Sequence, residues 1–209
     1  KNLCWSYAWM GMLRKGMKLE SRLRILCADS SFSPLGRIIL HHSLAASLIT
    51  RGEQRESNLL VNNTLVLAEE TGVHVFDFLL LANWCCILLG TGQLEQMPLF
   101  LERMRAALSP FGKLDHGQYH CLSAWYLLQV SQLMQANGEA EIGTDLVDFC
   151  GSFTPMALAR VIQAQVHLEL GNPEAAAALL DTIRQEPRLH RSAAMQWIVD
   201  LASADCAYA

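Results

Sequence analysis

The sequence has few charged residues and no long uninterrupted apolar run. Charged residues make up 17% of the 209-residue chain, against about 25% in an average soluble domain, while hydrophobic residues make up 52%. The most apolar stretch, residues 76–90, is shorter than the roughly 20 apolar residues that cross a bilayer and contains Asp77 and Asn83. The sequence therefore predicts no membrane span. The apolar surplus indicates that neighbouring segments or partners cover much of the surface.

Paired cysteines and a targeting segment are also missing. The seven cysteines are an odd number, lie within apolar patterns and include no CxxC pair. They predict a reducing, cytoplasmic setting without disulfides or structural zinc. The chain begins with Lys1 and shows no signal-peptide pattern, so we interpret it as a fragment of a longer protein. Its net charge of −4 gives no reason to expect direct nucleic-acid contact.

No group of residues has the pattern of an active site. His116 and His120 share one helix face at i, i+4 spacing, but the glutamate of an HExxH zinc site is absent. Ser43 follows His42, and adjacent side chains on a helix point about 100° apart, which prevents activation of the serine. We therefore expect no enzyme, no catalytic residue, no bound metal and no cofactor.

The residues that are present favour helices throughout. Apolar positions recur with a period of about 3.6 residues, strand-like alternation is absent, and good helix formers such as Leu, Ala, Met, Glu and Gln dominate. This pattern predicts an all-α fold. Breaks at glycine and proline divide the chain into about eleven predicted helices, at residues 2–15, 17–29, 34–51, 53–71, 74–91, 93–108, 114–136, 139–150, 155–170, 173–186 and 189–206.

Four stretches of the sequence resemble one another and suggest an internal repeat. Each places a glycine or Asn-Gly after an apolar run and before a new apolar pattern: ITRGEQRE (49–56), LGTGQLEQ (89–96), QANGEAEI (135–142) and LELGNPEAAAALLD (168–181). We interpret each stretch as the turn between the two helices of a hairpin.

The spacing of the glycine turns agrees with a helical repeat. Gly16, Gly52, Gly92, Gly138 and Gly171 are separated by 36, 40, 46 and 33 residues. Hairpins that recur about every 34 to 47 residues are typical of tetratricopeptide and related solenoids, in which neighbouring hairpins stack to bury a continuous core. The sequence therefore predicts one domain over residues 1–209, a right-handed, tetratricopeptide-like α-solenoid of about five hairpins.

Several stretches resemble the helical-repeat region of large ATP-dependent bacterial transcriptional regulators of the MalT/LuxR type. They are residues 51–108, YHCLSAWYLLQ (119–129) and PMALARVIQAQVHLELGNPEAAAALLDTIR (155–184). In that family a nucleotide-binding switch domain precedes the repeats and a helix-turn-helix often follows them. The chain has no GxxxxGK[ST] phosphate loop. The resemblance therefore implies effector sensing, partner docking or self-association for this chain, with ATP and DNA bound by other parts.

Aromatic residues of the predicted first helices are candidates for a binding groove. Trp84, Tyr119 and Trp125 combine apolar area with a polar group, as binding-site anchors do, and core packing is the alternative. Trp5 and Trp9 fall in another predicted first helix. His120 is either packed and hydrogen-bonded beside Tyr119 or in contact with a ligand.

A polar stripe on the predicted helix 155–170 is the second candidate. Arg160, Gln163 and His167 follow one another at i, i+3 and i+7. Facing a groove, Arg160 would pair with an anionic ligand or a partner's carboxylate. The alternative is an ordinary solvated helix face.

These observations predict a non-catalytic module in which a small effector, a peptide or a partner protein binds the concave groove. We expect it to be the sensing or docking region of a cytoplasmic transcriptional regulator. A general protein-interaction scaffold without a role in transcription, an enzyme hidden in an α–α array and self-association through apolar ends are the alternatives.

Overall fold

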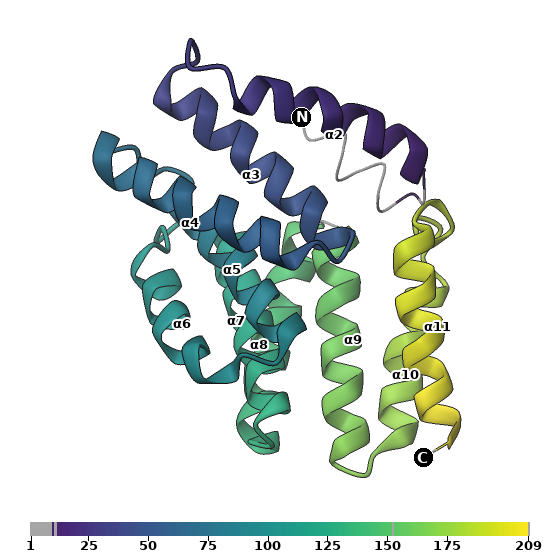
Figure 1. Ribbon diagram of the computed structural model, residues 1–209. Helices are drawn as coiled ribbons and strands as arrows, with labels where there is room; N and C mark the ends of the chain where they lie inside the picture. The colour runs from purple at the N-terminus through teal and green to yellow at the C-terminus, as the bar shows by residue number, and fades with distance from the viewer. Residues whose placement is uncertain (1–9, 11, 152, 209) are drawn as a thin grey trace. The chain divides into compact units, whose positions relative to one another are not determined.

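The structure is a computed structural model that describes residues 10, 12–151 and 153–208. Over these residues the chain forms helices and no β-strand, which confirms the all-α prediction (Figure 1). The helices are α2 (Leu13–Cys27), α3 (Pro34–Thr50), α4 (Gln54–Thr71), α5 (Asp77–Thr91), α6 (Met97–Ala106), α7 (Lys113–Gln129), α8 (Leu133–Cys150), α9 (Phe153–Glu169), α10 (Pro173–Arg184) and α11 (Ala193–Tyr208). Two short 3₁₀ turns, η1 (Leu94–Gln96) and η2 (Leu189–Arg191), precede α6 and α11.

The chain divides into two compact units, Lys1–Ala107 and Leu108–Ala209. In the first unit, α3 packs against α2, α4 and α5, and α5 also packs against α4 and α6. In the second unit, α8 lies between α7 and α9, and α9 also contacts α10 and α11. The single solenoid domain and its right hand stay predictions.

Each unit buries its own apolar side chains. In the first, Ile38 and Ala45 of α3 meet Val61 of α4 and Leu80 of α5. In the second, one cluster joins α7, α8 and α9, and its members are Cys121, Ala124, Ala140, Val147, Met156, Ala159 and Ile162. Packing of successive helices thus supplies the core that one helical hairpin cannot form alone.

One turn geometry recurs four times within the helix pairs. The residue in the turn has a left-handed backbone, and the next N–H donates to the carbonyl five residues earlier, as in a Schellman turn. The left-handed residues are Gly52, Gly92, Ser131 and Gly171 (φ 76°, 70°, 60° and 75°). The hydrogen bonds, each 2.9 Å long, are Glu53→Leu48, Gln93→Leu88, Gln132→Leu127 and Asn172→His167. The separations of 40, 39 and 40 residues are more regular than the sequence analysis suggested.

Two predicted helix breaks are wrong. Gly16 lies buried within α2, and Gly138 lies within α8, which begins at Leu133. Glycine inside a helix costs about 1 kcal/mol relative to alanine, an amount that packing outweighs here, since Ala136 and Ala140 of α8 are buried. The turn lies instead at Ser131, so the stretch QANGEAEI is part of a helix. The predicted helix 2–15 and its two tryptophans, Trp5 and Trp9, lie mostly outside the described residues.

Candidate functional site

The predicted groove residues are distributed over both units. Trp84 lies on α5 of the first unit. The other five lie in the second unit: Tyr119, His120 and Trp125 on α7, and Arg160 and Gln163 on α9. No binding measurement or bound partner bears on these residues, so their role in a groove stays a prediction.

His120 forms a polar contact within the second unit. Its Nδ1 lies 2.8 Å from Oε2 of Glu139 on α8, and its ring meets that of Tyr119 edge-on at 5.3 Å. His116, four residues earlier, directs Nε2 to the carbonyl of Ser109 at 3.1 Å. The two imidazoles therefore have separate protein partners. Within the described ranges, no group of three or more His, Cys, Asp or Glu residues is placed to hold a metal.

The polar stripe on α9 faces neighbouring helices. Arg160 donates through Nη2 to Asp148 of α8 at 2.6 Å and through Nη1 to Thr182 of α10 at 3.1 Å. Gln163 accepts a hydrogen bond from Thr144 of α8 at 3.2 Å. These side chains link α8, α9 and α10, an intramolecular role that the sequence analysis did not consider.

Trp125 and the buried cysteines serve packing. Trp125 is half-buried against the cluster that joins α7, α8 and α9. Burial raises the pKa of Cys85 and of Cys121 to about 12, and that of Cys86 to about 11. These thiols stay protonated at neutral pH and are poor nucleophiles.

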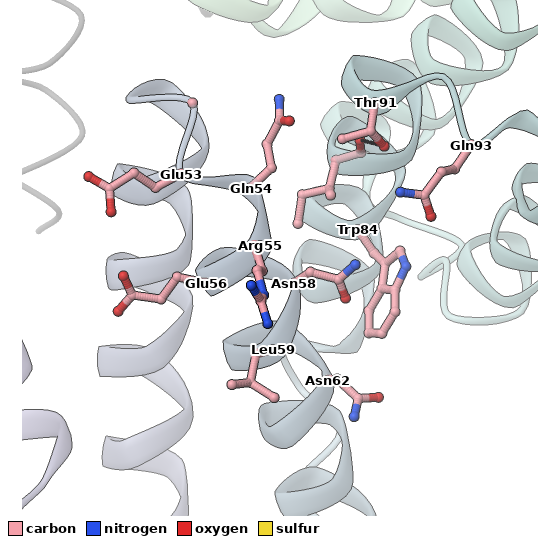
Figure 2. A pocket seen from close by; sticks show the side chains of 12 residues that line it. Glu53, Gln54, Arg55, Glu56, Asn58, Leu59, Asn62, Trp84, Thr91 and Gln93 are labelled. Atoms are coloured by element: carbon pink, nitrogen blue, oxygen red, sulfur yellow. Dashed lines mark hydrogen bonds between the residues drawn. The ribbon is translucent and has the colours of Figure 1, made fainter.

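The first unit contains an open hollow between α4 and α5, of about 1210 Å³ (Figure 2). Carboxamide side chains surround much of it: Gln54, Asn58, Asn62 and Gln93. Figure 2 shows Asn58 of α4 pointing toward the Trp84 indole of α5. Gly90 leaves room for Gln54, whose Nε2 lies 3.1 Å from the position that a β-carbon at Gly90 would occupy.

Trp84 is held rigidly at this hollow. Its ring stacks on Phe100 of α6, with centroids 4.8 Å apart and an angle of 15° between the planes. Its Nε1–H is buried and has no hydrogen-bond partner among the described residues, and such an unpaired donor costs roughly 1–3 kcal/mol. The prediction that Trp84 lines a groove agrees with its position here.

The opposite wall carries an apolar side chain and a cation. Leu59 is 62% exposed, and Arg55, also exposed, makes no ion pair within the described part of the chain. An exposed guanidinium offers five donors to a carboxylate, and carboxamides both donate and accept hydrogen bonds. The hollow therefore presents groups that complement a peptide backbone, an apolar side chain and one negative charge.

A chain of alternating charges adjoins the hollow and links α2 to the start of α4. Glu20 of α2 is buried and accepts from Arg24 at 3.1 Å and from Arg51 at 2.6 Å. Arg24 also pairs with Glu56, and Arg51 pairs with Glu53, both of which line the hollow. These pairs hold the first turn of α4 in place.

Sequence reasoning missed most of the hollow, including Asn58, Asn62 and Arg55. Their one signal is spacing: residues 55, 58, 59 and 62 follow one another at i, i+3, i+4 and i+7, which places them on one helix face. The sequence shows nothing to separate this face from an ordinary solvated one.

Comparisons with known proteins add no relative. No family model, no curated protein and no solved structure matches the chain. The resemblance to transcriptional regulators therefore stays an expectation. None of the described helices has the length and apolar character needed to cross a membrane.

Proposed function

We propose that this chain is a non-catalytic docking module that binds an extended peptide segment of a partner protein in the hollow between α4 and α5. The observation that carries the proposal is the lining itself, in which four carboxamides surround a fixed tryptophan and an unpaired arginine. Carboxamides on a rigid helical surface match the donors and acceptors of a peptide backbone. Arg55 favours a peptide with an acidic side chain.

The openness of the hollow favours a peptide over a small effector. Pockets for small molecules bury most of the ligand surface, commonly 70–90%, whereas this hollow is open to solvent along α4 (Figure 2). An extended chain gains affinity from many shallow contacts and needs no enclosure. Effector sensing is therefore the weaker of the two binding modes.

The wider setting of the proposal rests on the sequence resemblance. We propose a right-handed, tetratricopeptide-like solenoid that serves a cytoplasmic bacterial transcriptional regulator. The turn geometry that recurs every 39 to 40 residues supports a repeat architecture. A scaffold without a role in transcription would have the same groove, and the domains encoded beside this one distinguish the two.

The test is selection from a phage library of random 12-residue peptides, followed by fluorescence anisotropy with the enriched peptides. We expect acidic sequences, and a loss of affinity of at least about tenfold in Asn58→Ala and in Asn62→Ala, because each removes hydrogen bonds to the peptide backbone. Asn63→Ala is the matched control, since Asn63 is the neighbouring, exposed amide that does not line the hollow. Equal losses in Asn62→Ala and Asn63→Ala would overturn the proposed site.

A thermal-shift screen against sugars, nucleotides and amino acids decides between the two binding modes. A ligand at 100 times its Kd stabilises its protein by roughly 2.7 kcal/mol. A reproducible shift with one small-molecule class, together with no enriched peptide, would replace peptide docking by effector sensing.

A further inference from the structure

Helix α11 has apolar residues on two opposite faces. One face is buried, with Met195, Val199 and Ala202 each at most 2% exposed, where α11 packs against α9 and α10. The other carries Trp197 and Leu201, which are 67% and 52% exposed. At 100° per residue these two sets lie roughly 200° apart. A helix that is apolar on both sides is normally covered on both.

The exposed face extends to the end of the helix. It continues through Ala204 to Tyr208, and Tyr208 is 92% exposed. Three large apolar or aromatic side chains thus stand in one row on α11 without any described residue covering them.

The same face is buried in the first helix of each of the four helix pairs. Counting back from the left-handed residue of the repeated turn, the seventh residue is small and fully buried: Ala45, Cys85, Ala124 and Ala164, each 0% exposed. The fourteenth residue is buried as well: Ile38, Phe78, Gly117 and Ala157.

These buried positions face the second helix of their own pair. The hydroxyl of Ser57 on α4 donates to the Ala45 carbonyl of α3 at 3.1 Å. A β-carbon on Gly117 of α7 would lie 2.6 Å from Cγ1 of Val147 on α8. Cys85 of α5 lies 3.6 Å from the sulfur of Met104 on α6.

A shift of 40 residues relates α9 to α11 on both faces. Ala159 and Ile162 of α9 belong to the cluster with α7 and α8, and 40 residues later Val199 and Ala202 are buried. The same shift takes the other buried face of α9, made of Ala157, Val161 and Ala164, to Trp197, Leu201 and Ala204. Ala204 therefore repeats the small side chain that the four pairs bury.

We propose that α11 is the first helix of a fifth hairpin, and that its row of Trp197, Leu201 and Tyr208 is the docking surface for a second, antiparallel helix of the same polypeptide. A stable interface between separate proteins buries about 800 Å² on each partner and involves 20 to 30 residues a side. Three large side chains on one helix fall short of that. A helix joined by a short turn, as in the four observed pairs, avoids the entropy cost of association.

The size of the exposed side chains defines the helix that fits. On α9 the equivalent residues are small, and α10 supplies the larger Leu180 and Ile183, both buried. On α11 the order is reversed, since Trp197 replaces an alanine. Close packing alternates large and small side chains, so the covering helix has Ala, Gly or Ser where α10 has Leu180 and Ile183.

The experiment compares the 209-residue chain with the complete polypeptide that its gene encodes, by hydrogen–deuterium exchange. We expect residues 193–208 to exchange at least about tenfold more slowly in the complete polypeptide, because the covering helix stops local opening. Trp197→Asp should abolish that difference and leave exchange in the 209-residue chain unchanged. Asp205→Ser, an exposed polar position on the same helix, is the matched control and should preserve the difference.

Two results would overturn the proposal. One is a gene product that adds no helix after α11, or adds one without slowing exchange in α11. The other is a concentration-dependent dimer in light scattering that Trp197→Asp dissociates, which would make a second copy the occupant. Neither result affects peptide binding between α4 and α5, so this inference and the proposed function fail separately.

Discussion

At the scale of single residues, the carboxylate of Glu20 shows how a buried charge is held. The residue is 4% exposed and contacts Arg24, Arg51 and the hydroxyl of Ser47. A buried carboxylate keeps its charge at acceptable cost when it is paired and hydrogen-bonded. The two arginines are partly exposed, and solvent screens part of the attraction.

Glu20→Ala is expected to lower the free energy of unfolding by about 2 kcal/mol, because it leaves two neighbouring arginines without their shared carboxylate. Urea denaturation followed by circular dichroism measures the change. Glu102→Ala removes an exposed pair with Arg105 and should change stability by less than about 0.5 kcal/mol. Equal effects of the two substitutions would show that the Glu20 network contributes little.

His42 is the second residue whose charge state depends on its surroundings. Burial lowers the pKa of His42 below its ordinary value of 6.5. Its Nδ1 lies 3.1 Å from the side-chain amide of Asn83, and its ring lies 5.7 Å from that of Phe76. The folded chain therefore holds this imidazole neutral.

The consequence is a fall in stability with acid. Above pH 6.5 the imidazole is neutral in both states; as the pH falls below 6.5, only the unfolded chain takes up the proton readily, so the free energy of unfolding decreases. His42→Gln should reduce this slope, which one histidine can raise by at most about 1.4 kcal/mol per pH unit. Urea titrations between pH 7.5 and 5 measure it. A residual slope is expected from His41, whose pKa burial also lowers; an unchanged slope would contradict the assignment to His42.

At the scale of the helices and turns, backbone conformation decides what each glycine does. Gly171 has φ 75° in a turn, where a side chain is strained. Gly138 lies inside α8, and a β-carbon there would meet no atom within 4 Å. Ser131 has φ 60°, the left-handed region that glycine favours.

Three substitutions should therefore have different signs. Gly138→Ala is expected to raise the free energy of unfolding by about 0.5–1 kcal/mol, because alanine favours helix. Gly171→Ala is expected to lower it by about 1 kcal/mol. Ser131→Gly should raise it by about 0.5 kcal/mol, since the relief of left-handed strain exceeds the added backbone entropy. Thermal and urea unfolding check all three, and a destabilising Gly138→Ala would restore the turn that the sequence analysis placed there.

The sequence analysis located helices better than turns, for a reason visible at Ser131. Gly52, Gly92 and Gly171 are left-handed turn residues where the repeated stretches predicted them. The Asn137–Gly138 pair has the same local signature but forms helix, with the Asn137 amide bound to Glu141 at 2.8 Å. Packing of α8 against α7 outweighs a local preference of about 1 kcal/mol.

At the scale of the whole chain, the boundary between the two units is the segment that follows α6. Residues 108–112 precede α7, and within them Phe111 is 91% exposed. Exposed, non-helical segments are the preferred sites of proteolysis.

Limited chymotrypsin digestion is therefore expected to cut first after Phe111 and to release two fragments that stay helical. Mass spectrometry identifies the cut, and circular dichroism of the products measures the remaining helix. Phe111→Ser should delay this cut by at least about tenfold. First cleavage within a helix, for example after Phe149 of α8, would contradict the boundary.

The candidate site divides along the same line between local pattern and tertiary contact. Trp84 was predicted from residue type and helix position, and it lies at the α4–α5 hollow. Arg160 and Gln163 were predicted for a groove, but their bonds to Asp148, Thr182 and Thr144 link α8, α9 and α10. A sequence shows which polar residues share a helix face, and it cannot show which neighbour that face meets.

The sequence by itself determined that this chain is all helix, because the period of apolar residues and the helix propensities are local properties. It also located three of the four repeated turns, since glycine tolerates a left-handed backbone at no steric cost. Tertiary structure alone decided that Ser131 adopts that backbone and that Asn58, Asn62 and Arg55 face Trp84. It also left one apolar face of α11 bare. Each of these depends on which helices pack together, a relation between segments far apart in the chain.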